Sequence, residues 1–351
     1  MIEKRHMGVI VAPHRAEVHT EPIGVLKPTD LLLKMETNNI CTTDYQHWMG
    51  LRNHQGFPMA GGHEWSAIVL EKGAEVTAAL EVGDRVAMCS NGCGMCDSCR
   101  AGLTSECKAK ARKLINGYYG NRGFSNYRIV DQKDVLRIAN DIPPAEAGFL
   151  EPVSTVVSGI KKARVVPGET IVVLGAGTMG LLNAQVAHAY GAQVIITEIS
   201  EKKLDRASSM GIAQVVNAKE NDPVEAIKRL TGGRGADVVI PAVGNSIAYQ
   251  QAYQMLKPSR GRMLLFAAGY PEPELPLHMN ELHYRRIEII GTMNANVTDY
   301  REAASMISNK RVCCRYSLEG QTFGLKDIQK AYEAAATPDT YRITVDLQDV
   351  E

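Results

Sequence analysis

The chain has 351 residues, of which 45% are hydrophobic, and its 39 lysines and arginines balance its 39 aspartates and glutamates. This length suits two globular domains, and the zero net charge gives no overall field that would favour nucleic acid or an anionic membrane. The apolar stretch near the N-terminus is too short for a signal peptide, and no stretch approaches the roughly 18 apolar residues of a membrane helix. We therefore expect a cytoplasmic protein with reduced cysteines and with neither a nucleic-acid nor a membrane partner.

The first 150 residues predict a mostly β domain. Its short apolar runs are separated by turns and span residues 8–12, 30–35, 66–70 and 85–88. Cys41, His63 and Glu64 lie in this region, and Glu151 directly follows it. Each is ordinary alone, because a lone cysteine, for example, is usually a small buried apolar residue. Together they supply a thiolate, an imidazole and carboxylates, the ligand set of a catalytic zinc that keeps one coordination position open.

Four cysteines are concentrated in the loop SNGCGMCDSCRAGLTSEC, namely Cys93, Cys96, Cys99 and Cys107. Two-residue gaps let consecutive thiolates turn toward one tetrahedral ion, so the spacing predicts a structural zinc. An iron-sulfur cluster is the main alternative, but the bacterial ferredoxin run closes with a three-residue gap and a proline. Unmetallated thiols are the other alternative. A zinc with four protein ligands has no position for substrate, so the chemistry must lie elsewhere.

Residues 169–200 predict a βαβ unit that binds a dinucleotide. A β-branched run at 171–174 is followed by glycines in G-x-G-x-x-G register, a helical pattern that ends at Gly191, and a second strand at 194–197. Such glycines allow a sharp turn and let a pyrophosphate approach the backbone at a helix N-terminus. The candidate cofactor-binding residues are Gly175, Gly177, Thr178, Met179, Gly180, Glu198, Lys203 and Val243.

Glu198 predicts the choice of cofactor. It stands 18 residues after Gly180, at the end of the second strand, where a carboxylate can accept hydrogen bonds from the adenosine ribose diol and would repel a 2′-phosphate. We therefore expect NAD rather than NADP. The alternative is that Glu198 is only a surface carboxylate and that Lys202 or Lys203 neutralises the phosphate of NADP.

Strands and helices continue to alternate downstream, which predicts a doubly wound parallel sheet. The expected strands are 214–216, 237–240, 262–267 and 288–291, and the expected helices are 224–230 and 247–256. Ligands of such sheets bind at the carboxyl ends of the strands. The glycine motif, Glu198, residues 243–244 and residues 267–269 should therefore share one crevice.

The ordered set of motifs resembles the zinc-dependent medium-chain alcohol dehydrogenases over nearly the whole chain. The set comprises Cys41-x-x-Asp44, Gly62-His63-Glu64, the four-cysteine loop, Glu151-Pro152 and the fingerprint at 175–180. Glu64 and Glu151-Pro152 look most like the polyol branch, which includes sorbitol, threonine, butanediol and galactitol-phosphate dehydrogenases. The resemblance implies an α/β fold with a GroES-like, mostly β catalytic domain at 1–155, a Rossmann domain at 156–292, and a segment at 293–351 that returns to the catalytic domain. It also implies a homodimer or homotetramer.

The resemblance further implies hydride transfer between NAD and a secondary alcohol of a polyol, cyclitol or sugar alcohol, in an interdomain cleft. Two zinc ions per chain are expected, one catalytic and one structural. Cys41 and His63 would be ligands of the catalytic zinc, Glu64 a ligand or a close neighbour, and Glu151 a ligand directly or through water.

A proton relay would start at the hydroxyl of Thr43. The histidine that often ends this relay is replaced by Gln46, which does not titrate near neutrality, so the proton leaves through His47 or through Glu151 and water. We expect the water route. Candidate substrate contacts are Tyr45, Trp48, Phe57, Arg122, Asn294 and Asn296.

Two other function classes stay open. A zinc-free NADPH-dependent enone or quinone reductase could use the same scaffold, although the retained zinc ligands and Glu198 argue against it. A non-catalytic nucleotide-binding or RNA-binding protein could use a basic run that we otherwise expect to be a solvated face: Arg100, Lys108, Lys110, Arg112 and Lys113. The zero net charge and the lack of interleaved aromatic residues weigh against it.

Overall fold

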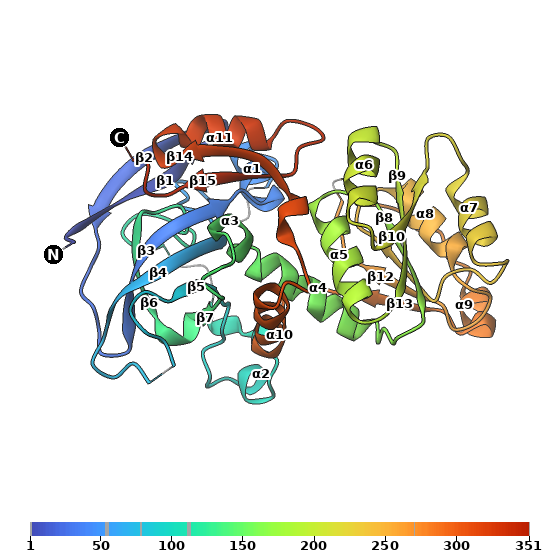
Figure 1. Ribbon diagram of the computed structural model, residues 1–351, viewed down its shortest axis with the longest axis horizontal. Coiled ribbons are helices and arrows are strands. Elements are labelled where there is room, and N and C mark those ends of the chain that lie inside the picture. Colours follow the sequence, from blue (N-terminus) through green and yellow to red (C-terminus); the bar gives the residue numbers. More distant parts are fainter. Residues whose placement is uncertain (1, 53–55, 78, 111–113, 270, 351) are drawn as a thin grey trace. The chain divides into compact units, whose positions relative to one another are not determined.

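The computed structural model describes residues 2–52, 56–77, 79–110, 114–269 and 271–350, and the chain divides into two units (Figure 1). Unit 1 comprises Met1–Ser154, Ala295–Lys310 and Leu318–Glu351, and unit 2 comprises Thr155–Asn294 and Arg311–Ser317. The return to unit 1 therefore begins at Ala295 and is interrupted by residues 311–317, which fold with unit 2.

Unit 1 is built on strands. β1 (Lys4–Ala12) and β2 (Arg15–Pro22) form an antiparallel hairpin. A larger sheet has the order β14-β15-β3-β4-β5-β7, with β6 also paired to β3. Its strands are β3 (Asp30–Asn39), β4 (Glu64–Lys72), β5 (Arg85–Met88), β6 (Tyr127–Asp131), β7 (Val135–Arg137), β14 (Leu318–Gly324) and β15 (Arg342–Asp346).

The helices of unit 1 are short and lie between or beside these strands. They are α1 (Thr42–Trp48), α2 (Asp97–Arg100), α3 (Pro144–Ala147), α10 (Val297–Ser308) and α11 (Ile328–Ala335), with single 3₁₀ turns η1 (Thr104–Glu106), η2 (Lys108–Lys110), η3 (Gln132–Asp134) and η5 (Leu325–Asp327). α4 (Leu150–Lys162) begins in unit 1 and continues into unit 2. α11 packs on β2, β14 and β15.

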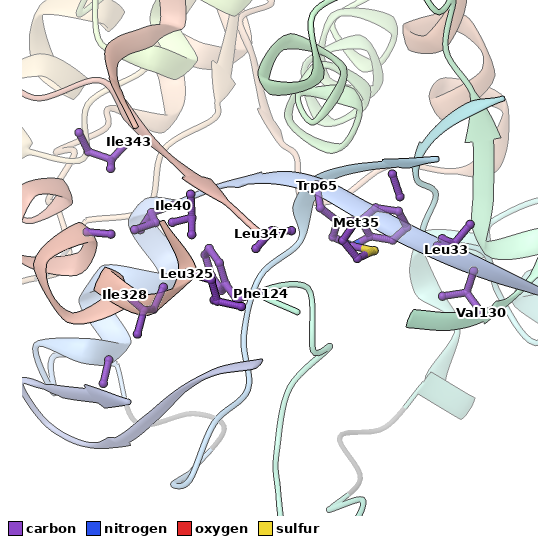
Figure 2. Packing of buried hydrophobic residues seen from close by; sticks show 14 of the residues in the cluster. Leu33, Met35, Ile40, Trp65, Phe124, Val130, Leu325, Ile328, Ile343 and Leu347 are labelled. Carbon is purple, nitrogen blue, oxygen red and sulfur yellow. The ribbon is translucent and has the colours of Figure 1, made fainter. Parts of the chain in front are cut away.

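The hydrophobic core of unit 1 joins the two ends of the chain. Leu33 and Met35 on β3 and Trp65 on β4 are buried in the same cluster as Ile328 on α11 and Ile343 on β15 (Figure 2). Alternate residues of β3 point to this core, as expected of a half-buried strand. Because β15 pairs with β3, the C-terminal segment completes the sheet that carries the N-terminal ligand candidates.

Unit 2 contains one parallel sheet with the order β10-β9-β8-β11-β12-β13. Its strands are β8 (Thr170–Leu174), β9 (Gln193–Glu198), β10 (Ala213–Asn217), β11 (Val238–Pro241), β12 (Arg262–Leu265) and β13 (Glu288–Gly291). Its helices are α5 (Thr178–Ala189), α6 (Glu201–Ser209), α7 (Pro223–Leu230), α8 (Ser246–Met255) and α9 (Met279–Arg285), with the turn η4 (Cys314–Ser317). The strand order reverses between β8 and β11, which is the switch point where doubly wound sheets bind ligands.

The predicted fold class is confirmed, with a GroES-like unit and a Rossmann unit. The strands predicted at 85–88 and 288–291 have those bounds in the structure, and the one predicted at 262–267 ends earlier, at Leu265. α6 and α9 were not predicted. In the part of the chain that the structure describes, no helix combines the length and apolar character needed to cross a membrane.

Candidate metal centre and dinucleotide site

Cys41, His63 and Glu64 meet in unit 1, with one possible ligand atom from each lying within 4.8 Å of the others. Cys41 is the N-cap of α1, and His63 and Glu64 stand at the start of β4. Gly62 makes this approach possible, because its φ is +95° and a Cβ there would lie 2.1 Å from Nδ2 of Asn38. Only glycine avoids both the strain and the overlap. A thiolate, an imidazole and a carboxylate at this spacing are a donor set that fits zinc.

Asp44 is a charge partner of the His63 imidazole. Its Oδ2 lies 3.5 Å from Nδ1 of His63. Asp44 is held in turn by the backbone N–H groups of Cys41 and Gly62, at 3.3 and 3.4 Å. Burial raises the pKa of the Asp44 carboxyl, and the positive charge of His63 opposes that rise. Burial would lower the pKa of His63, but the negative charges of Asp44 and Cys41 raise it well above its usual value.

Arg342 is a member of this site that the sequence analysis missed. It comes from β15, and its Nη2 donates to Oε1 of Glu64 at 2.8 Å and approaches Sγ of Cys41 at 3.3 Å. Glu64 is fully buried, so its carboxylate needs such a partner. One signal was present, since Arg342 interrupts the apolar strand sequence YRITVDL.

Glu151 lies close enough to interact with the charges of this cluster, although it is outside the compact group of Cys41, His63 and Glu64. It stands in the first turn of α4 and is partly buried. Burial raises the pKa of its carboxyl, the charge of Glu64 adds to the rise, and His63 opposes it. A cation at the cluster would favour the ionised form of Glu151.

The expected relay residues are held by polar contacts. Oγ1 of Thr43 accepts a hydrogen bond from Nη1 of Arg52 at 3.1 Å. His47 is fully buried, and its Nδ1 and Nε2 lie 2.6 and 3.2 Å from the carbonyl oxygens of Arg52 and Gly56. Because carbonyl oxygens only accept hydrogen bonds and a neutral imidazole carries one N–H, His47 donates to one of these two carbonyls.

The four cysteines of the loop also converge, with all four Sγ atoms within 4.8 Å of one another. The N–H of Cys93 donates to Sγ of Cys107 at 3.3 Å and lowers the pKa of Cys107 to about 6, whereas burial raises the pKa of Cys99 to about 11. A Cβ at Gly92 would lie 2.2 Å from Sγ of Cys99, so glycine is required there. Four sulfur donors in this arrangement fit a structural zinc.

In the glycine motif of unit 2, two glycines have no room for a side chain and the third does. Gly175 has a φ of +96°, and a Cβ at Gly180 would lie 1.9 Å from the carbonyl oxygen of Gly175. Both are therefore required by the turn between β8 and α5. A Cβ at Gly177, the N-cap of α5, would meet nothing within 4 Å. The protein itself does not require glycine there, but a pyrophosphate that approaches the backbone does.

Glu198 ends β9 beside this motif. Its Oε2 accepts the N–H of Ala176 at 2.6 Å, and its Oε1 accepts those of Ile199 and Ser200 at 2.7 and 3.0 Å. The carboxylate therefore fixes the glycine turn to the end of β9 and still has lone pairs for ribose hydroxyls. Glu198 is only 9% exposed. This burial argues against the alternative that Glu198 is merely a surface carboxylate.

The other predicted cofactor residues follow the carboxyl ends of β8, β9 and β11. A Cβ at Gly175 would approach Cγ1 of Val243 to 2.7 Å. Thr178 and Met179 form the first turn of α5, and the carbonyl of Thr178 accepts a hydrogen bond from Ser317 at 3.4 Å. Lys203 lies in the first turn of α6 and is partly buried.

Several candidate substrate contacts have structural partners. Arg122 donates to Oε1 of Glu21 at 2.9 Å, Asn296 caps α10 and accepts the N–H of Ser105 at 3.0 Å, and Trp48 stacks on Tyr332. In the basic run, Arg100 and Lys108 are exposed. Arg112 and Lys113 lie outside the described residues.

Comparison with known families follows the same division of the chain. Residues 27–140 match the alcohol dehydrogenase GroES-like domain, and residues 178–309 match the zinc-binding dehydrogenase family. An alcohol dehydrogenase of Rhizobium meliloti is 33% identical over 306 residues, covering 84% of this chain and 86% of that protein. The chain belongs to the zinc-type alcohol dehydrogenases. As a zinc-type alcohol dehydrogenase it is an oxidoreductase.

Other relatives of this zinc-type alcohol dehydrogenase include a sorbitol dehydrogenase of Halalkalibacterium halodurans, 29% identical over 317 residues, or 89% of this chain and 90% of that protein. A zinc-binding dehydrogenase from Sinorhizobium meliloti, solved bound to NADP, superposes with a TM-score of 0.87. It is 24% identical and covers 98% of this chain and 99% of its own, so this likeness concerns the fold.

Proposed function

We propose that this protein is a zinc-dependent dehydrogenase that transfers hydride between a secondary alcohol of a polyol-type substrate and NAD. The observation that carries the proposal is the convergence of Cys41, His63 and Glu64 on one site, with ligand atoms within 4.8 Å of one another. The likeness to a sorbitol dehydrogenase over 89% of the chain supports a polyol.

Cys41, His63 and one glutamate would hold the catalytic zinc. Glu64 is already neutralised by Arg342, which contacts both of its carboxylate oxygens. Burial raises the pKa of the Glu151 carboxyl, and the charges of His63 and Arg342 oppose that rise. We therefore assign direct or water-mediated coordination to Glu151 and assign to Glu64 the role of fixing Arg342 behind Cys41.

Zinc bound at this site would polarise the substrate hydroxyl, and bound NAD would accept the hydride. The side chains of the protein would hold zinc and NAD in place and carry the proton away from the substrate. Asp44 holds His63 by an ionic contact at Nδ1, and Nη2 of Arg342 donates to Sγ of Cys41. The hydroxyl of Thr43 accepts the substrate proton before water and Glu151 receive it. The amides at the N-terminus of α5 and the open space at Gly177 suit the pyrophosphate.

The carboxylate of Glu198 supports NAD rather than NADP, because it would repel a 2′-phosphate. The variant Glu198→Gln keeps the size of the side chain and removes its charge. We expect it to lower the ratio of kcat/KM for NAD to that for NADP by about tenfold, or about 1.4 kcal/mol of discrimination. An unchanged ratio would contradict this role.

The proposal is tested by measuring reduction of NAD and NADP with a panel of alcohols. The panel comprises sorbitol, xylitol, myo-inositol, 2,3-butanediol, L-threonine and ethanol. We expect NAD reduction with at least one polyol, and none with the matched variant Cys41→Ser. Reduction of an enone by NADPH in protein freed of zinc, without polyol oxidation, would instead establish the enone reductase alternative.

A further inference from the structure

A cavity of about 430 Å³ opens in unit 1 on the strands beside the metal centre. This volume is within the range of small-molecule sites. Among the described residues that line it there is no candidate zinc ligand, although Trp65 directly follows Glu64 in the chain. Met88, Ile129 and Val130 form its apolar wall, and the side chain of Arg128 supplies a positive charge.

In the part of the chain that the structure describes, the guanidinium of Arg128 has no hydrogen-bond or ion-pair partner. It lies 5.0 Å from the centre of the Trp65 ring, and in the described ranges no carboxylate or carbonyl is within hydrogen-bond distance of it. Trp65 is 1% exposed, and its Nε1 is a buried donor with no hydrogen-bond acceptor among the described residues. A partly buried guanidinium and a buried N–H that have no acceptor both cost free energy, and a ligand that supplies acceptors removes that cost.

The surroundings of Arg128 carry excess positive charge. Arg5 and Arg122 share a single carboxylate oxygen, Oε1 of Glu21, with each Nε at 2.9 Å. Burial lowers the pKa of Arg128, the charge of Arg5 adds to that, and Asp134 opposes it. Arg5 and Arg122 are thus both paired with Glu21, and no contact joins Glu21 to Arg128.

Asp131 and Asp134 also line the cavity, but neither forms an ion pair with Arg128. Oδ2 of Asp131 is 3.0 Å from Nζ of Lys133, and Oδ2 of Asp134 is 3.8 Å from the same nitrogen. Lys133 therefore partly neutralises both, and among the described lining residues Arg128 is the positive group, with the Trp65 ring but no carboxylate in contact with it.

We propose that this cavity binds the oxyanion group, carboxylate or phosphate, of a small molecule, and that the guanidinium of Arg128 is its charge partner. The planar fork of arginine matches two oxygens of such a group. The apolar wall suits a short hydrocarbon portion, so a small organic carboxylate should bind more tightly than inorganic phosphate. This inference does not depend on the proposed dehydrogenase reaction.

The full-length protein can be titrated with butyrate, benzoate and inorganic phosphate by calorimetry at constant ionic strength, with chloride as the reference salt. The variant Trp48→Phe leaves Trp65 as the only tryptophan of the chain, so its fluorescence reports on this cavity. We expect saturable binding, a change in Trp65 emission, and binding about tenfold weaker or worse in Arg128→Gln. The control Arg15→Gln removes the same charge from an exposed ion pair with Glu17 and should bind as the wild type does.

Two further measurements keep the test decisive if Arg128→Gln folds poorly. Arg128→Lys keeps the charge but loses the planar fork, and it should weaken binding while the protein stays folded. The wild type, but not Arg128→Met, should gain thermal stability when the oxyanion is added. Absence of saturable binding by all three anions, or equal affinity in the wild type and the folded Arg128 variants, would overturn the proposal.

Discussion

Arg342 and Glu64, 278 residues apart in the chain, form a buried ion pair in which Nε of Arg342 lies 2.9 Å from Oε2 and Nη2 lies 2.8 Å from Oε1. Burial would lower the pKa of Arg342, but the charges of Cys41 and Glu64 raise it. The last strand of unit 1 thus places a positive charge against Sγ of Cys41 and the carboxyl group of Glu64 at the start of the sheet. The metal centre therefore depends on the C-terminal segment.

The variant Arg342→Met should leave Glu64 buried without a partner and lower the free energy of unfolding by about 3–5 kcal/mol. Urea unfolding measures the change. The exposed pair of Arg15 and Glu17 provides the control, since Arg15→Met should change the stability by less than about 0.5 kcal/mol. In the double variant Glu64→Gln/Arg342→Met the loss should be smaller than in Arg342→Met alone. If Arg342→Met matched the wild type, the ion pair would have no structural role.

The glycine motif gives a test that separates folding from binding. Gly177→Ala should fold normally, because its Cβ meets nothing within 4 Å, yet bind NAD about tenfold more weakly or worse. Gly180→Ala should be destabilised by about 1–3 kcal/mol or more, because its Cβ would lie 1.9 Å from the carbonyl of Gly175. Thermal unfolding and NAD titration of both variants distinguish the two effects. Unchanged NAD affinity in Gly177→Ala would argue against a pyrophosphate at this turn.

Much of unit 2 could be predicted because its signals are local. The β-branched run, the glycines and the apolar helix spacing lie within about 30 residues, and β8, α5 and β9 match them closely. α6 was missed because it is polar around most of its circumference, with only Ala207 fully buried. Its sequence EKKLDRASS contains few apolar residues, so it lacks the run of apolar positions from which α5, α7 and α8 were predicted.

The metal centre was less predictable, because its geometry depends on contacts between distant segments. Cys41 and His63 were identified from their residue types and order, but no local pattern shows that β15 pairs with β3 and brings Arg342 to them. Asn296 illustrates the same limit. Its amide was a plausible substrate contact in sequence, but it caps α10 and binds Ser105 on the four-cysteine loop.

The four-cysteine loop should show unequal thiol reactivity once metal is removed by a chelator. Because the N–H of Cys93 lowers the pKa of Cys107 to about 6 and burial raises that of Cys99 to about 11, Cys107 is a thiolate at pH 7.5 and Cys99 is a thiol. Iodoacetamide should therefore modify Cys107 first, with a rate that rises through about pH 6. Mass spectrometry of samples labelled between pH 5 and 9 measures both sites. Equal rates at the two cysteines would contradict the assignment.

Asp237 should make the stability of unit 2 depend on pH. Its Oδ1 accepts from Nζ of Lys257 at 2.7 Å and its Oδ2 accepts the N–H of Thr170 at 2.9 Å. Burial opposes these contacts, but the net effect lowers the pKa of Asp237 below its usual value. The folded protein thus binds the proton less tightly than the unfolded chain, so the stabilisation is present above about pH 4 and is lost as pH falls through the folded pKa.

The variant Asp237→Asn should therefore lose about 1–2 kcal/mol at pH 7 and little at pH 2–3. Denaturant unfolding across this pH range measures the difference. The exposed pair of Asp141 with Lys310 is the control, because Asp141→Asn should have a smaller effect at every pH. A constant difference between Asp237→Asn and the wild type from pH 7 to pH 2 would refute the linkage.

The most direct test of the central claim is the zinc content of the purified chain and of Cys41→Ser, determined by elemental analysis alongside NAD reduction with the best polyol. The account predicts two zinc ions per wild-type chain. In Cys41→Ser it predicts one zinc, retained by the four-cysteine loop, and no turnover. One zinc in both proteins, or polyol oxidation that survives in Cys41→Ser, would show that Cys41, His63 and the neighbouring glutamates do not form the catalytic metal centre.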